Sequence, residues 1–583
     1  MTASSRAPRR PAWPVKALWG VLALTAVVYF DVVSHPFEYD DYNVLVNNQA
    51  VHGLSDLRTL WTSPHAGSAA GGSGYRPVLL TFLAVEYAAF GDKPWGYHLV
   101  SLFLHLLSVG LTWSLMMRLA ADRRAAFAAA ALVALHPMHT EAVNYLTAQA
   151  SVAVAVLQMV ALLGSTAALG RRGIARAGRY GGALAAVGLA LGVKEIAVMF
   201  PVLLWLWEWY RPGGLNARRR ALWALPFLAL VAAYLALRQA VLAGAVAAPS
   251  TAASIAVAVA TTIKVIVFSL GTWIWPFNLS IDHGNVVVSG DARAWWWLIG
   301  AAAVMAVAWW VARHGRRAPF FVLAWVSASL LPVGAVVFFD NVALYQENRA
   351  YLAGVGLALA LAPAIVRAFD RAGARWGTRF AAATVVLAVA SGAWLVAART
   401  HVWRDGLALW RDAAAKHPDS GHAHTGMGLA YHAAGRMEEA EAALRESWRL
   451  DPTDFSTAFE LGELLIALGR RDEGMAYHER VAERVMGRPR MEILKGDVLL
   501  ARGDVEGAGA AYRAAQALGL ETPELFVRLG SIHERAGRTE DALTAYRRAL
   551  DGPFAETEQD RTWNTLAQEG VARLSSSRSG NAP

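Results

Sequence analysis

The chain has 583 residues, of which 56% are apolar, and its mean hydropathy of +0.33 is higher than that of ordinary soluble proteins of this length. The net charge is +9, but the arginines cluster between apolar runs without a basic stripe that carries aromatic residues, so nucleic-acid binding is not expected. The absence of cysteine excludes disulfides, zinc–thiolate sites and thiol catalysis. These features predict an integral membrane protein.

Hydrophobicity divides the chain into two parts. Long apolar runs extend to about Ala398, and a charged sequence with helical periodicity follows. We therefore expect an all-α protein with a cytoplasmic N-terminus at 1–14, a transmembrane domain at 15–400, a helical repeat domain at 401–575 and a disordered tail at 576–583. The abundance of Ala and the use of Arg over Lys are typical of a prokaryotic protein, which favours a bacterial inner membrane.

The first apolar run, Val15–Val33, follows a basic flank, and no small-residue cleavage site comes after it. We therefore expect an anchor whose N-terminus stays in the cytoplasm. Further spans are expected near 95–118, 125–138, 143–169, 180–193, 196–210, 220–242, 292–312, 319–338, 351–369 and 379–398. Arginines occupy every second link between the expected spans, and arginine-bearing links stay in the cytoplasm. The alternate links, which carry acidic residues, therefore lie on the outer side. The run Ser254–Pro276 is apolar enough to cross, but we expect it to lie along the outer interface or to re-enter. About eleven spans then place the C-terminal domain outside the cytoplasm.

The C-terminal part repeats itself every 34 residues. Three registers of small residues share this step: Gly428, Gly462, Gly496 and Gly530; Gly435, Gly469, Gly503 and Gly537; Ala440, Gly474, Ala508 and Ala542. This period is typical of tetratricopeptide repeats (TPRs), whose small residues let two helices pack closely. We expect a half-repeat at Trp403–Pro418, four full repeats and a cap at Glu558–Leu574. Such a solenoid usually holds a peptide or protein segment in its groove, although it could also be a spacer.

The first outer loop, at 34–94, contains two adjacent carboxylates, Asp40 and Asp41. One carboxylate can accept a proton from a hydroxyl nucleophile while the other orients it. Proximity to lipid raises a carboxyl pKa toward useful basicity. The alternative is a helix N-cap or a solvated turn. The pair is our candidate for the catalytic site.

The outer links also carry side chains suited to binding a phosphate or a sugar: Arg76, His136, His139, Glu141, Lys194, Glu195, Asp282, Glu347 and Arg349. The guanidinium of Arg349 can bind phosphate oxygens, although this residue could instead be an interfacial anchor. Lys194 and Glu195 follow a span, where charges are costly unless they pair or serve a site. His136 and His139 match no common metal-ligand spacing, so we expect them to donate hydrogen bonds to a phosphate. No metal and no other cofactor is expected.

Several short motifs together carry a resemblance: Tyr39-Asp40-Asp41 with Asn47-Asn48, Tyr75-Arg76-Pro77-Val78, Phe90-Gly91, the run Pro94-Trp95-Gly96-Tyr97-His98-Leu99-Val100 with His105, His136-Pro137-Met138-His139-Thr140-Glu141-Ala142-Val143, and Lys194-Glu195. On these residues the chain resembles the transmembrane and tetratricopeptide repeat protein O-mannosyltransferases and their bacterial relatives, which belong to the GT-C superfamily. Asp282 and the segment Glu347–Tyr351 match more weakly, because that segment departs from the family's Glu-Arg-Tyr-Leu-like run.

The resemblance implies a polytopic GT-C-type transmembrane helix bundle followed by a TPR α-solenoid. It implies that Asp40 is the general base, with Asp41 as its partner or alternative. The implied reaction transfers a hexose, mannose by analogy, from a polyprenyl-phosphate sugar to Ser/Thr hydroxyls of proteins with inversion. The TPR groove would hold the acceptor, and the donor's tail would lie among membrane lipid. Three other interpretations remain open: a GT-C enzyme that glycosylates a lipid or polysaccharide, a membrane-anchored TPR scaffold without activity, and a transporter.

Overall fold

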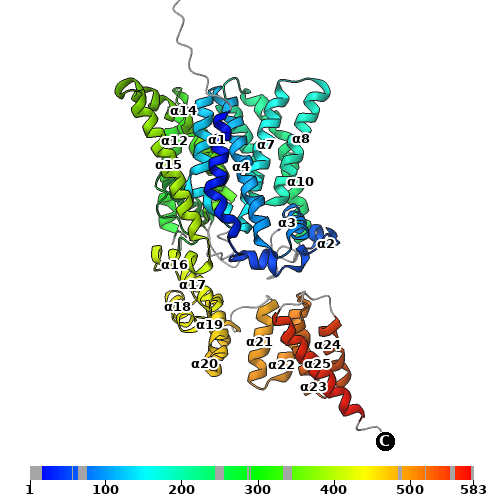
Figure 1. Cartoon of the computed structure of the whole chain (residues 1–583). Helices are drawn as coiled ribbons and strands as arrows, with labels where there is room; N and C mark the ends of the chain where they lie inside the picture. Colours follow the sequence, from blue (N-terminus) through cyan, green and yellow to red (C-terminus); the bar gives the residue numbers. More distant parts are fainter. Residues whose placement is uncertain are drawn as a thin grey trace, which may run out of the picture. The chain divides into compact units, whose positions relative to one another are not determined.

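The computed structural model describes residues 16–55, 57–63, 75–242, 255–284, 288, 291–332, 345–482, 489–518, 520–551 and 558–579. Every regular element in these ranges is helical, which confirms the all-α fold class (Figure 1). Contacts divide the chain into a membrane unit, residues 1–68 with 72–420, and a repeat unit, residues 421–583 with 69–71. The expected cytoplasmic segment 1–14 lies outside the described residues.

The membrane unit consists of helices α1 (Lys16–Tyr29), α2 (Leu57–Thr62), α3 (Pro77–Phe90), α4 (Pro94–Ala120), α5 (Arg123–Leu135), α6 (Thr140–Asn144), α7 (Gln149–Leu169), α8 (Gly173–Val193), α9 (Phe200–Tyr210), α10 (Ala217–Leu242), α11 (Ile255–Ile274), α12 (Asp291–Arg313), α13 (Ala318–Leu330), α14 (Tyr351–Trp376), α15 (Thr378–Val402) and α16 (Gly406–Lys416). Short 3-10 or π turns, η1 to η6 and η8, join several of them, among them η2 (Tyr42–Val46), η4 (Pro137–His139), η6 (Glu195–Met199) and η8 (Glu347–Ala350).

Eight helices in the described ranges are long and apolar enough to cross a membrane, which confirms several candidate spans but differs from the expected count of about eleven. Four expected spans are not among the eight. Helices α5, α9 and α13 have 13, 11 and 13 residues and are therefore shorter than a full span, and α8, with 21 residues, includes Arg176 and Arg179. Helix α11, which we expected to lie along the interface, is among the eight by length and composition. Its course through the membrane stays a prediction.

The polar links after α5 and α8 and before α14 gather at one end of the helix bundle, because η4 contacts η8, and α13 contacts both η8 and η6. At the opposite end, Arg124 at the start of α5 forms an ion pair of 2.6 Å with Asp370 of α14. Small residues such as Ala129, Ala155 and Ala190 are fully buried between the helices and allow the backbones to approach closely. The bundle thereby holds the candidate site on closely packed helices.

Helix α16, the expected half-repeat, belongs to the membrane unit. Its residue Asp412 accepts a hydrogen bond of 2.7 Å from Arg399 at the end of α15, and Lys416 donates one of 2.6 Å to the Leu279 carbonyl. Trp403, which precedes α16, stacks on Tyr145 with 5.8 Å between the ring centroids. The division between the two units therefore falls after Ser420 and not at residue 400, where we had placed the end of the transmembrane domain.

The repeat unit consists of α17 (Gly421–Ala433), α18 (Met437–Leu450), α19 (Phe455–Ala467), α20 (Arg471–Ala482), α21 (Pro489–Ala501), α22 (Val505–Ala517), α23 (Pro523–Arg535), α24 (Thr539–Asp551) and α25 (Glu558–Ser579). Gly435 follows the first helix of its pair with φ of +72°, a conformation that favours glycine. At Gly496 a Cβ atom would lie 2.3 Å from the Tyr512 ring, so the close packing requires glycine. Helix α25 includes residues 576–579, so the expected disordered tail begins as helix.

Candidate active site

Asp40 lies in a strained segment at the polar end of the bundle. The preceding residue, Tyr39, has a φ of +54°, which is unusual for a residue with a side chain and is often found at functional sites. Tyr145 is buried beside the pair Asp40 and Asp41, and burial together with the charges of these carboxylates raises the pKa of the Tyr145 phenol. The Asp40 side chain is partly exposed, so it is accessible to a substrate.

Asp41 is buried and serves to hold the loop. Its carboxylate accepts hydrogen bonds from Thr147 through the backbone N–H at 2.8 Å and the hydroxyl at 2.7 Å, and from the Glu38 N–H at 3.0 Å. Burial raises the pKa of Asp41 to about 7 although these hydrogen bonds act in the opposite direction. Because the oxygens of Asp41 are used inside the protein, Asp40 is the better placed of the two to act as a base.

Three cations from distant parts of the sequence interact near Asp40. Arg76 forms a two-point ion pair with Glu195, at 3.0 and 2.7 Å. The charge of Glu195 is the main cause that raises the pKa of Arg76, and the charge of Asp40 adds a smaller effect. Burial lowers the pKa of Lys194 to about 7, and the charges of Arg76 and Arg349 add to this effect. Arg76, Lys194, Glu195 and Arg349 are therefore within electrostatic reach of one another, and Asp40 is within reach of Arg76.

Lys194 differs from Arg76 in its partners. Its ammonium donates to the Ser151 hydroxyl at 2.7 Å and to the Asn348 side-chain oxygen at 3.5 Å. No carboxylate forms an ion pair with Lys194 among the residues that the structure describes. The charge of Arg76 is balanced by Glu195, so Lys194 is the better candidate to neutralise an anionic substrate group.

Glu141 and Glu347 are buried supports of the site. The Glu141 carboxylate accepts hydrogen bonds from the Glu347 N–H at 2.9 Å and from the Asn348 amide. Glu347 accepts from the Ser280 N–H at 2.8 Å and lies 2.9 Å from the His283 ring nitrogen. These contacts fix η8 and, through Asn348, the position of Lys194. In this structure the two glutamates support the site, and their expected role in binding the donor stays a prediction.

Asp282 also acts as a support. It accepts a hydrogen bond from the Ser420 hydroxyl and another, 3.2 Å long, from the Gly284 N–H. Glu195 is occupied by Arg76, as described above. Both carboxylates are therefore bonded within the protein, and their expected role in binding a sugar or phosphate stays a prediction.

The two histidines of the second outer link contact backbone carbonyls of the membrane unit. The His136 ring stacks on Trp273, with 4.4 Å between centroids, and its Nε2 atom lies 2.7 Å from the Trp273 carbonyl oxygen. The Nδ1 atom of His139 lies 2.8 Å from the Val133 carbonyl oxygen. Burial lowers the pKa of His136 to about 3 and that of His139 to about 4, so both rings are neutral. In this structure they hold the turn η4, and the expected hydrogen bonds to a phosphate stay a prediction.

Sequence reasoning missed three polar residues of the site: Tyr145, Ser151 and Asn348. Asn348 lies inside a motif that the sequence had pointed to, and Ser151 is a polar residue near the start of the mostly apolar helix α7. Such a polar residue in an apolar helix is the signal that could have identified Ser151.

The repeat unit and part of the membrane unit match known proteins. The tetratricopeptide repeat family matches residues 395–455 and 493–556. The protein O-mannosyl-transferase Tmtc1 of Drosophila melanogaster is 29% identical over 316 residues, which are 48% of this chain and 35% of that protein. Tmtc2 of Drosophila melanogaster is 33% identical over 24% of this chain and 16% of its own length, and human TMTC2 is 31% identical over 24% and 17%.

Part of the chain is thus similar to protein O-mannosyl-transferases. This finding and the repeat match confirm the resemblance that the motifs indicated. The matched segments span about a third or less of the length of these curated relatives.

Solved structures show more distant similarity. The oligosaccharyltransferase of Archaeoglobus fulgidus is 14% identical with a TM-score of 0.38, over 66% of this chain and 55% of that chain. The TPR protein YrrB is 19% identical with a TM-score of 0.23, over 28% of this chain and 80% of that chain. At these scores neither structure bears on the candidate site.

Proposed function

We propose that this chain is a membrane glycosyltransferase of the GT-C type, which transfers a hexose from a polyprenyl-phosphate donor to Ser/Thr hydroxyls of proteins with inversion. The hexose would be mannose, as the names of the curated relatives imply. The observation that supports this most is that Arg76, Lys194 and Arg349 interact electrostatically and that Arg76 also interacts with Asp40. The reaction would take place at the outer face of a bacterial inner membrane.

The proposed chemistry is a single displacement. Asp40 accepts the proton of the acceptor hydroxyl while the hydroxyl oxygen forms a bond to the anomeric carbon. The bond between the anomeric carbon and the phosphate oxygen breaks, and the electron pair leaves with polyprenyl phosphate. Lys194 and Arg349 stabilise the charge of this phosphate, and Arg76 does so within its ion pair with Glu195. The repeat unit binds the acceptor and supplies orientation. No metal or cofactor takes part in this scheme.

The direct test incubates the purified full chain with polyprenyl-phosphate mannose and Ser/Thr-containing peptides, and analyses the products by mass spectrometry and NMR. We expect mannose on hydroxyl oxygens with an anomeric configuration opposite to that of the donor. Transfer to a lipid or polysaccharide but to no peptide would contradict the proposed acceptor. Binding of peptides without any turnover would favour a scaffold.

The rate of transfer should depend on the charge of Lys194. Its pKa is lowered to about 7, so the ammonium is charged below this pH and loses its proton as the pH rises. We expect kcat/KM to fall on the alkaline side of about pH 7 and this fall to move to higher pH in Lys194→Arg, because a guanidinium stays charged. The exposed Lys93→Arg is the matched control. An alkaline limb that is unchanged in Lys194→Arg would contradict this role.

The ion pair between Arg76 and Glu195 offers a test of two roles. Arg76→Gln leaves the Glu195 carboxylate without its partner, so we expect a lower Tm and a loss of activity of about 100-fold or more. The double variant Arg76→Gln/Glu195→Gln removes the unpaired charge and should recover most of the lost Tm. If the double variant also regains wild-type kcat, Arg76 holds the loop in place and has no role at the phosphate.

A further inference from the structure

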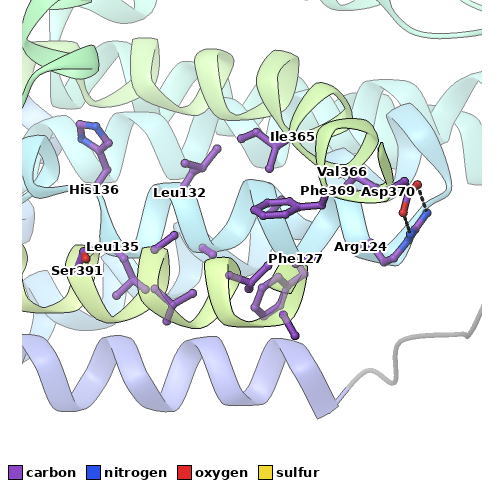
Figure 2. A pocket seen from close by; sticks show the side chains of 18 of the residues that line it. Arg124, Phe127, Leu132, Leu135, His136, Ile365, Val366, Phe369, Asp370 and Ser391 are labelled. Atoms are coloured by element: carbon purple, nitrogen blue, oxygen red, sulfur yellow. Dashed lines mark hydrogen bonds and ion pairs between the residues drawn. The ribbon is translucent and has the colours of Figure 1, made fainter. Parts of the chain in front are cut away.

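A long groove lies on the membrane unit away from the candidate active site. Helices α5, α14 and α15 enclose it with a volume of about 990 Å³, and Figure 2 shows its side chains. Most of its lining is apolar, including Phe127, Leu132, Leu135, Ile365 and Phe369. A groove of this composition in the apolar part of a membrane protein is suited to a hydrocarbon chain.

The end of the groove at His136 carries no charge that would bind a phosphate. His136 and Trp273 form its wall there, with their rings stacked at 4.4 Å. The imidazole is neutral, since burial lowers the pKa of His136 to about 3. Arg76, Lys194 and Arg349 do not line the groove. The donor's phosphate therefore finds no cation at this end.

The opposite end is strongly basic. Gly373, Ala374 and Thr378 line the groove, and Arg371, Arg375 and Arg379 lie beside them in sequence. These three arginines are exposed, and no carboxylate forms an ion pair with them in the part of the chain that the structure describes.

Neighbouring residues place this basic end at a membrane surface. Trp376, 58% exposed, lies between these arginines, as aromatic residues do at membrane interfaces. Arg124 and Asp370 close the groove with their ion pair at the same end (Figure 2). Basic sites between membrane helices bind anionic lipid headgroups.

The length of the groove fits one leaflet of a bilayer. Arg124 and Leu135 line its two ends and are eleven residues apart on α5, which corresponds to about 16 Å of helix. The hydrocarbon core of a bilayer is about 30 Å thick, so the groove spans about half of it. An acyl chain of a membrane lipid has this reach, whereas a long polyprenyl tail would extend beyond it.

We propose that this groove binds one acyl chain of an anionic glycerophospholipid, whose phosphate headgroup lies against Arg371, Arg375 and Arg379. The proposal is independent of the transfer reaction, since it concerns the opposite end of the bundle. Helix α15 forms one wall of the groove and leads directly into α16. The lipid therefore fills the space between α15 and the helices α5 and α14, and stabilises the membrane unit.

The test uses the full chain in nanodiscs of phosphatidylglycerol or of phosphatidylcholine with the same acyl chains, followed by native mass spectrometry of the lipid that stays bound. We expect one retained phosphatidylglycerol and at least about tenfold less retained phosphatidylcholine. Ala388→Trp, which fills the groove, should lose the bound lipid, whereas Val386→Trp, on the same helix but outside the lining, should retain it. Arg375→Gln/Arg379→Gln should reduce the preference for phosphatidylglycerol by about tenfold or more.

The matched control for the charge variant is Arg171→Gln/Arg172→Gln, which removes two exposed arginines from another link. If this control loses the preference as fully as Arg375→Gln/Arg379→Gln does, the binding is a general surface effect and the proposal is wrong. Equal retention of both lipids by the wild type would also overturn it. The proposal would also be overturned if polyprenyl phosphate copurified with the wild type and was lost in Ala388→Trp. The charge variants lie on the surface, so they remain informative if Ala388→Trp does not fold.

Discussion

Asp40→Asn should reduce the rate of hexose transfer by at least about 100-fold, because it removes the group that accepts the proton of the acceptor hydroxyl. The replacement is close in size, and the Asp40 side chain is partly exposed. We therefore expect an unchanged Tm, unchanged membrane insertion and unchanged binding of the donor. The rate is measured with purified protein, polyprenyl-phosphate mannose and an acceptor peptide. Loss of transfer together with loss of folding would not support the role of a base.

Asp41→Asn is the informative comparison for the same loop. The Asp41 carboxylate accepts three hydrogen bonds inside the protein, and an amide can accept them with one oxygen only. We expect a lower Tm and a partial loss of activity that follows the loss of structure. If Asp41→Asn abolishes transfer with an unchanged Tm while Asp40→Asn stays active, the two roles are reversed. Full activity of the double variant Asp40→Asn/Asp41→Asn would contradict the mechanism altogether.

Truncation after Thr400 should prevent folding of the membrane unit, whereas truncation after Ser420 should preserve it. The segment between these points contains Trp403, Leu409 and Trp410, which are 1%, 0% and 4% exposed. Loss of one buried Trp side chain costs about 3–5 kcal/mol, and the total stability of a domain is about 5–15 kcal/mol. The loss of this segment therefore exceeds what the unit can tolerate. Thermal unfolding in detergent and gel filtration measure the outcome.

Truncation after Ser420 also tests the role of the repeats. A chain that ends at Ser420 keeps Asp40, the three cations and α16, but it lacks α17 to α25. We expect it to fold, to bind the donor and to transfer hexose to protein acceptors much more slowly. A chain ending at Thr400 that behaves like the one ending at Ser420 would show that α16 is not part of the membrane unit.

The repeats could be predicted from the sequence because their glycines meet strict local requirements. Gly435 must adopt a positive φ, and Gly496 must admit the ring of Tyr512, so both positions recur with the period of the fold. The arginine-bearing links assigned Arg76, Lys194 and Arg349 to one side of the membrane, and these three residues do interact electrostatically. The period of the glycines predicts the repeats, and the arginine-bearing links predict the side of the membrane on which a residue lies.

Other features depend on packing between distant residues and could not be predicted. Asp40 and Asp41 are adjacent, and only the fold shows that one is buried on Thr147 while the other remains accessible. Nothing local indicates that the His139 ring turns toward the Val133 carbonyl. The half-repeat α16 has the pattern of the repeats, yet Trp410 packs against Tyr39 of the membrane unit, with 5.5 Å between ring centroids.

The central claim is that the cations and Asp40 form one site for a lipid-linked sugar phosphate. The most direct measurement is photo-crosslinking of a polyprenyl-phosphate analogue with a reactive group at the phosphate, followed by mass spectrometry of the labelled peptides. The account predicts labelling of the segments that contain Lys194 and Arg349, reduced in Lys194→Gln. Labelling confined to the repeat unit, or to the arginine-bearing end of the membrane unit, would contradict it.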